Sequence, residues 1–310
     1  MRLHEDKEAF KILIIKAAEE YHIPESAIER DYYIVRALSF LSQSEFSDCC
    51  VFKGGTSLSK CYPGSIERFS EDIDLTFLPK EDMSDGEIER CLKKIENIMT
   101  RGAEIEKINL QRNKRNKSLY FWFGDKDSRI KLEIGSSVRS EPYGLKSLKT
   151  YIQDYLEKHG FEDVIKEYCL AKIDINVLAM ERTFLDKIMA VKRHAICGSL
   201  PEKARHIYDV CRLFQMPDIQ GFLINKRELK QLIGLTKETD KVYLEKRNIP
   251  KEYNPLGPYS FDKWEKCFMD AKDVYEHLHE ELLYTDEKQN FAEAIQTFET
   301  IDRILREIGE

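Results

Sequence analysis

Two aspartates, Asp72 and Asp74, stand one residue apart in the segment 71–77, EDIDLTF. Because successive side chains of a β-strand point to opposite faces, a strand here would project both carboxylates from one face and Ile73 and Leu75 from the other. Two like charges held that close repel each other unless a cation neutralises them or one of them takes up a proton. Mg²⁺ prefers such oxygen ligands and keeps open positions for water and substrate phosphates. The spacing therefore predicts a magnesium site.

A Gly-Gly-Thr-Ser sequence, residues 54–57, precedes the aspartates and could hold phosphates. Gly54 and Gly55 can adopt backbone conformations closed to other residues and let a ligand approach the main chain. If a helix begins at Thr56 or Ser57, its free N–H groups favour a phosphate. Taken alone, a Gly-Gly pair is usually a turn and an Asp-x-Asp is usually a solvated strand edge. Together, between apolar flanks, they predict a nucleoside triphosphate held by Mg²⁺.

A third carboxylate is expected on a neighbouring strand, because a two-metal phosphoryl-transfer site needs enough anionic ligands for both ions. Residues 119–134, LYFWFGDKDSRIKLEI, read as two apolar strands joined by a Gly-Asp-Lys-Asp turn, which is typical of a hairpin. In the second strand Glu133 alternates with apolar residues and so projects from the polar face. It could be a metal ligand or a general base; equally, it could be an exposed residue paired with a cross-strand Lys or Arg.

Further segments extend the pattern: 28–33 (IERDYY), 181–188 (ERTFLDKI) and 204–210 (ARHIYDV). Together with Gly-Gly-Thr-Ser and Arg68-x-Ser70-x-Asp72-x-Asp74, they resemble, in the same order, the motifs of polymerase-β-type nucleotidyltransferases in their AbiEii/AbiGii toxin form. The resemblance covers roughly residues 25–215. Two positions depart from the family pattern: Glu133 stands where Asp is common, and His206-Ile207 stands where Lys-Asp or Arg-Asp is usual.

The resemblance implies a nucleotidyltransferase toxin of a toxin–antitoxin or phage abortive-infection pair. Such an enzyme would add nucleotides to an acceptor, such as a tRNA 3′ end, and stop translation; its antitoxin would be encoded nearby. Two Mg²⁺ ions and a nucleoside triphosphate substrate are expected. The expected catalytic residues are Asp72, Asp74, Glu133, Lys187 and Asp209, the first three as metal ligands. The expected nucleotide-binding residues are Gly54, Gly55, Thr56, Ser57, Lys60, Arg68, Ser70 and Arg205.

Two later helices carry the remaining polar candidates. A helix over residues 181–194 would place Lys187 on its inner edge, where it could reach a β- or γ-phosphate; the alternative is a solvated lysine. In the next helix Arg205 and Asp209 stand at i and i+4, so an ordinary ion pair worth a few tenths of a kcal/mol is the plain alternative. With the resemblance, phosphate contact is favoured for Lys187 and a structural or substrate-orienting role for the other two.

Composition bounds the class of protein. The 310 residues are 42% hydrophobic and 34% charged, which is ordinary for a globular protein able to form two domains. No apolar run reaches the length of a membrane span, and the first twenty residues mix both charge signs with helical periodicity, unlike a signal peptide. Eight scattered cysteines without a Cys-x-x-Cys pair argue against a zinc site and for reduced thiols in the cytoplasm.

The net charge of −7 argues against a protein that coats nucleic acid by charge alone. Basic residues are nonetheless concentrated in 107–117, KINLQRNKRNK, and in 182–206. A local basic cleft beside the metal site could accept an RNA end. For 107–117 the simpler interpretation is a strand edge or loop guarded by charge.

The predicted fold is α+β: a small mixed sheet with flanking helices, then a mostly helical domain. Helices are expected over 1–46, 56–62 and 85–100, and strands over 49–53, 72–78 and within 104–135, with a strand or turn near 170–178 and a Pro/Gly-rich loop at 250–260. The predicted domains are 1–146, the nucleotidyltransferase core, and 147–310, which would complete a cleft for nucleotide and acceptor.

Three other functions stay open at this stage. A phosphotransferase could use the same residues to move a phosphate instead of a nucleotide. A degenerate transferase could merely bind nucleotide or a partner protein. Such a protein would have lost one or more of the acidic metal ligands, whereas all three expected ligand positions carry an acid here. A housekeeping adenylyltransferase acting on tRNA ends or small molecules is also compatible with the helical second half.

Overall fold

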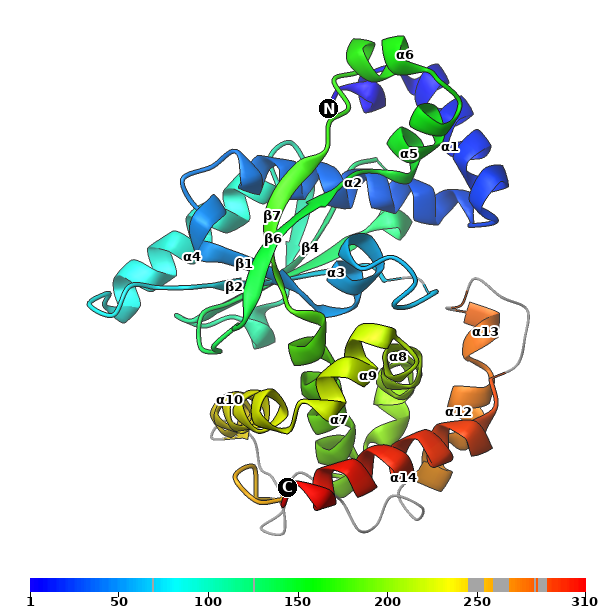
Figure 1. Ribbon diagram of the computed structural model, residues 1–310. Coiled ribbons are helices and arrows are strands. Elements are labelled where there is room, and N and C mark those ends of the chain that lie inside the picture. The colour runs from blue at the N-terminus through cyan, green and yellow to red at the C-terminus, as the bar shows by residue number, and fades with distance from the viewer. Residues whose placement is uncertain (69, 125, 245–253, 259–267, 282, 284–288) are drawn as a thin grey trace. The chain divides into compact units, whose positions relative to one another are not determined.

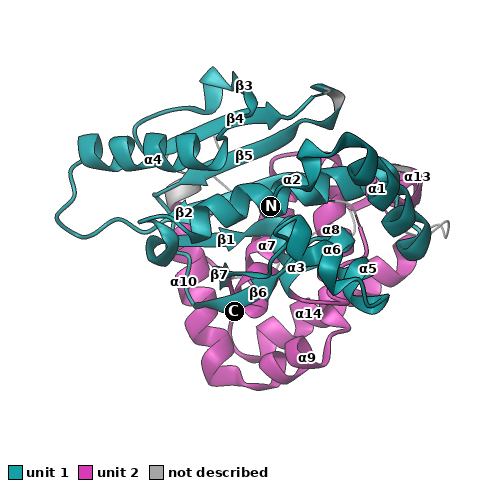
Figure 2. Cartoon of the chain, turned by 90° about the horizontal axis from the view of Figure 1, so that it is seen from above, with its two compact units in different colours: residues 1–61, 69–177 teal, residues 62–68, 178–310 magenta. Residues whose placement is uncertain are grey.

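The computed structural model describes residues 1–68, 70–124, 126–244, 254–258, 268–281, 283 and 289–310. The chain divides into two compact units (Figure 2). Unit 1 comprises residues 1–61 and 69–177, and unit 2 comprises residues 62–68 and 178–310. Apart from residues 62–68, unit 2 thus begins at residue 178.

Unit 1 is built on one mixed seven-stranded sheet in the order β3-β4-β5-β2-β1-β7-β6 (Figure 1). Its strands are β1 (Cys50–Lys53), β2 (Asp72–Phe77), β3 (Glu104–Lys107), β4 (Asn116–Trp122), β5 (Ile130–Gly135), β6 (Tyr143–Leu148) and β7 (Ile173–Leu178). β2 pairs antiparallel with β1 and parallel with β5, while β4 runs antiparallel to both β3 and β5. The mixed sheet and the hairpin of β4 and β5 confirm the predicted α+β class.

The expectation that 104–135 holds the remaining strands was wrong for β6. This strand lies at the sheet edge beside β7, and five of its six residues are exposed. An edge strand with little burial shows no clear apolar alternation, and its partner β7 lies 25 or more residues further along the chain. The strand foreseen near 170–178 is confirmed as β7, which pairs parallel with β1.

Helices cover the sheet of unit 1: α1 (Lys7–Tyr21), α2 (Glu25–Ser42), α3 (Gly54–Cys61), α4 (Asp85–Met99), α5 (Tyr151–Lys158) and α6 (Glu162–Glu167). α4 begins with a capping box between Ser84 and Glu87 and buries Ile88, Leu92, Ile95 and Met99 along one stripe. It packs against β4 and β5 and against α2. Short 3₁₀ turns occur at Leu3–Glu5, Ser47–Cys49, Asn109–Gln111 and Lys126–Ser128.

Unit 2 is helical in its described residues. It contains α7 (Met180–Ile196), α8 (Ala204–Phe214), α9 (Pro217–Ile224), α10 (Lys226–Leu244), α12 (Lys272–Glu276), α13 (Leu278–Glu281) and α14 (Phe291–Glu307), with 3₁₀ turns at Leu200–Lys203 and Met269–Ala271. α7 packs against α8 and α10, and α8 packs against α14 (Figure 1). Most of the loop foreseen at 250–260 lies outside the described residues. No described helix is both long and apolar enough to cross a membrane.

Candidate active site

Asp72 and Asp74 lie on β2 and share the polar face of the sheet, as their spacing predicts. Ile73 and Leu75, between and beyond them, are buried on the other face. In the parallel ladder with β5, Asp72 pairs with Lys131 and Asp74 pairs with Glu133. Because paired residues of neighbouring strands project to the same side, Glu133 lies next to Asp74. The register thus brings the three predicted carboxylates onto one face.

Both the backbone conformation at position 54 and the packing around it require glycine. It has φ +85°, a conformation that residues with a side chain rarely adopt. A Cβ built at this position would lie 2.2 Å from Oδ2 of Asp74. The absence of a side chain at Gly54 therefore lets the carboxylate of Asp74 pack directly against the start of α3. α3 begins at Gly54, two residues earlier than the predicted helix.

The hydroxyl groups of the Gly-Gly-Thr-Ser sequence face inward. Thr56 and Ser57 are buried, and Ser57 donates a hydrogen bond to the carbonyl of Gly54 at 2.9 Å. Oγ1 of Thr56 lies 2.9 Å from Oγ of Ser70 and donates to the carbonyl of Asp72. These side chains tie the start of α3 to the strand that carries the aspartates. Their predicted contact with phosphates stays a prediction.

Lys60 forms a buried ion pair with Asp31 of α2, with Nζ 2.5 Å from Oδ1. Asp31 also accepts a hydrogen bond from the backbone N–H of Tyr151 at 2.8 Å, and the Lys60 ammonium lies 4.3 Å from the ring centroid of Tyr151. Desolvation by burial raises the pKa of Asp31, although Lys60 and the hydrogen bonds oppose this. Lys60 thus joins α2, α3 and the start of α5, and its contact with a nucleotide stays a prediction.

Two lysines on the carboxylate face were not singled out from the sequence. Lys131 forms an ion pair with Glu133, and Lys53 stands opposite Asp74 in the antiparallel ladder of β1 and β2. Burial lowers the pKa of Lys131, but the hydrogen bond and charge of Glu133, with the charge of Asp72, outweigh it, so the pKa is raised. Lys131 could have been found from the alternation of apolar and polar residues over 130–134, which places Lys131 and Glu133 on one face.

The carboxylates fit a metal ion in chemical type, but they do not form a complete cage. Among the described residues, no group of three Asp, Glu, His or Cys side chains is placed to hold a metal ion. Asp72 and Asp74 present carboxylate oxygens, the ligand type that Mg²⁺ prefers, from one face of β2. Glu133 instead contacts Lys131. The arrangement therefore fits a divalent cation at the aspartate pair.

A second polar cluster lies inside unit 2 around Asp209 of α8. Arg68 binds the carboxylate of Asp209 in bidentate fashion, from Nε to Oδ1 at 2.6 Å and from Nη2 to Oδ2 at 2.7 Å. Lys187 of α7 donates to the same Oδ2 at 2.7 Å. Burial opposes the charge of Asp209, but the two cations outweigh it and hold its pKa well below the usual range. All three side chains are buried.

This cluster differs from both simpler interpretations of the later helices. Lys187 is buried, so it is not a solvated lysine. Asp209 pairs with Arg68 and Lys187, whereas Arg205 one turn earlier is exposed. Nδ1 of His206 lies 3.4 Å from Nζ of Lys187, and burial with that nearby charge lowers the pKa of His206. The plain alternative, an ion pair between Arg205 and Asp209, is therefore not what the structure shows for Asp209.

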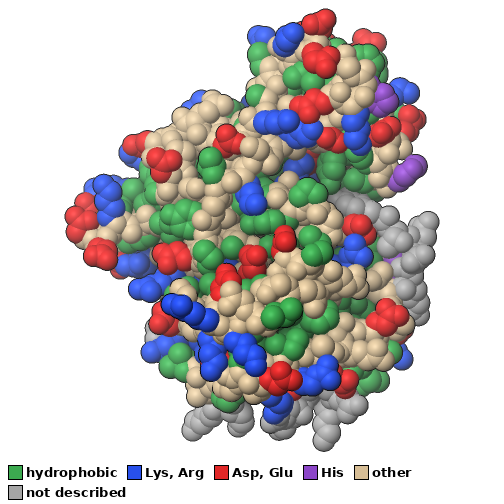
Figure 3. All heavy atoms as spheres, viewed as in Figure 1, with side chains coloured by type: hydrophobic (Ala, Val, Ile, Leu, Met, Phe, Trp, Pro, Cys, Tyr) green, Lys and Arg blue, Asp and Glu red, His purple; other side chains and the backbone are tan. Residues whose placement is uncertain are grey.

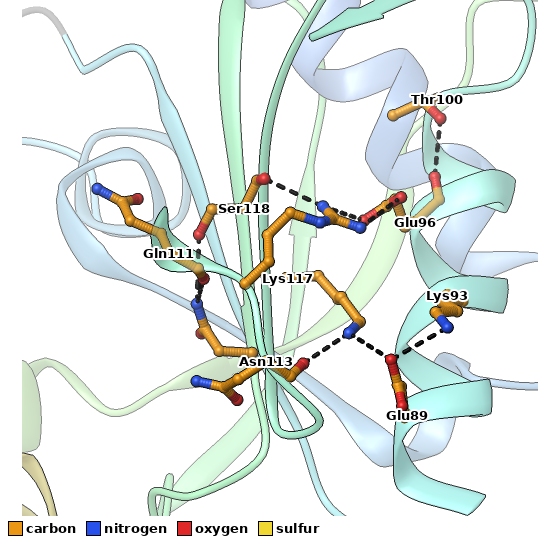
Figure 4. A network of polar contacts seen from close by, with 10 residues as sticks. Glu89, Lys93, Glu96, Thr100, Gln111, Asn113, Lys117 and Ser118 are labelled. Carbon is orange, nitrogen blue, oxygen red and sulfur yellow. Dashed lines mark hydrogen bonds and ion pairs between the residues drawn. The ribbon is translucent and has the colours of Figure 1, made fainter. Parts of the chain in front are cut away.

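The basic segment 107–117 pairs with α4. Arg112 contacts Glu96 at 2.7 Å, Lys117 contacts Glu89 at 3.1 Å, and Arg115 contacts Asp85 at 2.7 Å. Figure 4 shows the part of this network around Glu89 and Glu96. The simpler interpretation, a charged strand edge or loop, fits these contacts, because three of the five basic residues form ion pairs with α4.

In the other basic stretch, 182–206, most basic side chains also contact groups of the same chain. Arg182 is buried and donates to Thr239 at 2.7 Å, Lys187 binds Asp209, Lys192 donates to the carbonyl of Pro258, and Arg193 pairs with Asp240. On the described part of the face in Figure 3, basic and acidic side chains are interspersed. These two stretches therefore do not supply a broad basic surface for RNA.

Solved structures with a similar fold include a nucleotidyltransferase toxin. MenT4, a nucleotidyltransferase toxin from Mycobacterium tuberculosis, is similar with a TM-score of 0.51 and 18% identity over 95% of this chain and 97% of that one. JHP933 from Helicobacter pylori gives a TM-score of 0.47 and 16% identity over 92% of each chain. A putative nucleotidyltransferase from H. pylori gives 0.44 and 15% over 93% of this chain and 100% of that one.

The family is shown by the sequence model described as "Nucleotidyl transferase AbiEii toxin, Type IV TA system", which matches residues 36–305. The chain belongs to this AbiEii family of nucleotidyltransferase toxins. The resemblance drawn from the motifs is thereby confirmed. No curated protein matches the chain.

Proposed function

We propose that this protein is a Mg²⁺-dependent nucleotidyltransferase that moves a nucleoside monophosphate from a nucleoside triphosphate to an RNA 3′ hydroxyl and releases pyrophosphate. Family membership supports nucleotidyl transfer in general. The observation that carries the metal-dependent reaction is the placement of Gly54, with no room for a Cβ, against the carboxylate of Asp74. A tRNA 3′ end is the proposed acceptor.

Asp72 and Asp74 would hold the cation, and the backbone at the start of α3 would receive the phosphates. A bound Mg²⁺ would lower the pKa of the attacking hydroxyl and neutralise charge on the triphosphate. Gly54 lets the start of α3 lie directly against the carboxylate of Asp74, so the proposed phosphate-binding backbone lies beside a proposed metal ligand. The buried Thr56 hydroxyl keeps this backbone tied to the carbonyl of Asp72, so that the start of α3 and the ligand strand hold one geometry.

In unit 2, Lys187 is the proposed source of positive charge for the phosphates, and Asp209 is a positioning residue for it. Asp209 binds Lys187 and Arg68 together. The peptide passes from unit 2 to unit 1 between Arg68 and Asp72. The bidentate Arg68–Asp209 pair therefore anchors the end of the segment that leads into β2. An exposed Arg205 remains available for the acceptor or the nucleotide.

The biological setting follows from the family. As a type IV toxin, the protein would act in the cytoplasm, inhibit growth by disabling translation, and be opposed by a cognate antitoxin encoded nearby. Abortive infection of phage-infected cells is one use of such a pair.

The reaction is tested by incubating the protein with total RNA, Mg²⁺ and each nucleoside triphosphate, labelled at the α-phosphate or at the γ-phosphate. We expect α-label to enter RNA with the wild-type chain and with Asp163→Asn, which removes a fully exposed carboxylate on α6. The double variant Asp72→Asn, Asp74→Asn should show no transfer.

Each other result of this labelling assay would support a different conclusion. Transfer that persists in the double variant would exclude the aspartate pair as the catalytic metal site. Entry of the γ-label instead of the α-label would show a phosphotransferase. No transfer of either label to any RNA would favour a small-molecule acceptor or a binding module.

A further inference from the structure

A tyrosine of β4, Tyr120, lies on the same face of the sheet as the aspartate pair. The register places Tyr120 beside Lys131 of β5 and Lys131 beside Asp72 of β2, so the three residues form one row across adjacent strands (Figure 2). The charge of Lys131 interacts with both Asp72 and Tyr120. Because neighbouring strands lie about 4.8 Å apart, the backbone of Tyr120 is about 10 Å from that of Asp72. A molecule that reacts at the aspartates can therefore reach the ring of Tyr120.

Tyr120 presents a partly exposed ring with a cation beside it. It is half-buried, and the guanidinium carbon of the exposed Arg129 lies 4.6 Å from the ring centroid. Trp122 follows on the same face but is only 8% exposed, and Nζ of Lys126 lies 5.3 Å from its ring centroid. Single-stranded nucleic acids stack their bases on aromatic rings, and a neighbouring arginine adds to the attraction. Tyr120 can therefore accept a base, whereas Trp122 is largely covered.

The place of Tyr120 in the sheet indicates which reactant it contacts. β1 leads into α3, whose start is the proposed triphosphate site, and β1 pairs with one side of β2; β5 and β4 follow on the other side. In phosphoryl transfer the attacking and leaving oxygens lie roughly in line. If pyrophosphate leaves toward α3, the attacking hydroxyl must approach from the side of β5 and β4. Tyr120 thus lies on the side from which the acceptor enters.

We propose that Tyr120 and Arg129 form a stacking platform for the 3′-terminal base of the RNA acceptor. This inference rests on the proposed function and deepens it. Charge alone does not explain binding here, because Lys126 forms an ion pair with Glu106 at 2.6 Å and the charge of Arg129 also acts on Glu106. Stacking on one ring needs no broad basic surface and tolerates any base, since every base has a π-face. The protein thus binds the acceptor at its end.

The test is a double-mutant cycle between the ring and the base, and it needs no turnover. A short single-stranded RNA with a fluorophore at its 5′ end is titrated with the full chain, and anisotropy gives the dissociation constant. A second RNA lacks its 3′-terminal base, and a third lacks an internal base. We expect the wild-type chain to bind the second RNA at least about fivefold more weakly than the intact RNA. Tyr120→Leu should bind these two RNAs equally.

Controls separate stacking from structure. Tyr120→Phe keeps the ring and should retain the preference for the terminal base. Arg129→Gln removes an exposed cation and should reduce that preference, and it provides the test if Tyr120→Leu does not fold. Tyr143→Leu removes a tyrosine that is 39% exposed on β6, at the far edge of the sheet, and should equal the wild-type chain. In the wild-type chain, loss of the internal base should weaken binding less than loss of the terminal base.

Failure of this inference and failure of the proposed function look different. Equal binding of the first two RNAs by the wild-type chain, no binding of any RNA, or an unchanged preference in Tyr120→Leu would overturn the platform. Weaker binding of Mg²⁺-bound nucleoside triphosphate by Tyr120→Leu, with unchanged RNA binding, would assign the ring to the incoming nucleotide and overturn it too. Coupling between Tyr120 and the terminal base without any label transfer would support the platform and refute nucleotidyl transfer.

Discussion

At the scale of single residues, the strictest steric requirement is at Gly54. We predict that Gly54→Ala abolishes nucleotidyl transfer, because the new Cβ would occupy the space of Oδ2 of Asp74, 2.2 Å away. It should also lower the free energy of unfolding by about 1–3 kcal/mol, since strain at positive φ and overpacking both contribute. Activity assays and urea unfolding measure the two effects.

Gly160→Ala is the matched control for this change. Gly160 also has a positive φ, +73°, but nothing lies within 4 Å of its hypothetical Cβ. This variant should show the backbone strain alone and keep full activity. If Gly54→Ala were as active as Gly160→Ala, the close packing of Gly54 against Asp74 would have no catalytic importance.

His206 makes stability depend on pH. Its pKa is lowered in the folded protein by burial and by Lys187, with Lys203 and Arg68 acting in the same direction and Asp209 opposing them. Below pH 6.5 the unfolded chain therefore binds a proton that the folded chain resists, so this contribution to stability is complete above 6.5 and is lost as the pH falls. The expected slope is at most about 1.4 kcal/mol per pH unit.

The measurement is the free energy of unfolding between pH 7 and pH 5. His206→Gln should flatten this profile, whereas His277→Gln, which removes an exposed histidine of the same unit, should leave it unchanged. An equally steep profile in His206→Gln would assign the pH dependence to other groups.

At the scale of elements, two kinds of ion pair join α4 to the segment that leads into β4. Glu96 and Arg112 are nearly buried, with 4% and 13% of their side chains exposed, whereas Asp85 and Arg115 are 51% and 40% exposed. Arg112→Ala leaves Glu96 buried without its partner and should cost about 2–4 kcal/mol of stability. Arg115→Ala should cost no more than about 1 kcal/mol.

Thermal or chemical unfolding of the two variants side by side tests this ranking. Added salt should reduce the small effect of Arg115→Ala further, because exposed pairs are screened. Equal losses in the two variants would mean that burial does not govern the strength of these pairs.

At the scale of the whole molecule, a bound cation should stabilise the sheet around β2. A ligand at about one hundred times its dissociation constant adds about 2.7 kcal/mol to the stability of the state that binds it. Amide hydrogen exchange with and without Mg²⁺ should therefore show increased protection at β1, β2 and β5. The double variant Asp72→Asn, Asp74→Asn should show no such increase, and protection that rises in it equally would place the ion elsewhere.

Much of the local structure could be predicted because it repeats over a few residues. Alternation with a period of two places Asp72 and Asp74 on one face of β2 and Glu133 on the polar face of β5, and the structure has both. The apolar stripe and the Ser84 cap likewise determine α4. β6 was not predicted, because an exposed edge strand shows no regular apolar pattern and depends on β7 for its pairing.

The sequence by itself determined the family, the carboxylate pair and the glycine turn, because these are patterns of neighbouring residues. Only the tertiary structure decided which charges meet. Arg68 and Asp209 are 141 positions apart, and Lys131 stands beside Asp72 only through the register of β2 with β5. Long-range packing decides such pairs, since a buried charge must find a partner wherever the fold brings one. The aspartates were thus evident from spacing, whereas the lysine that contacts Glu133 became evident from the sheet.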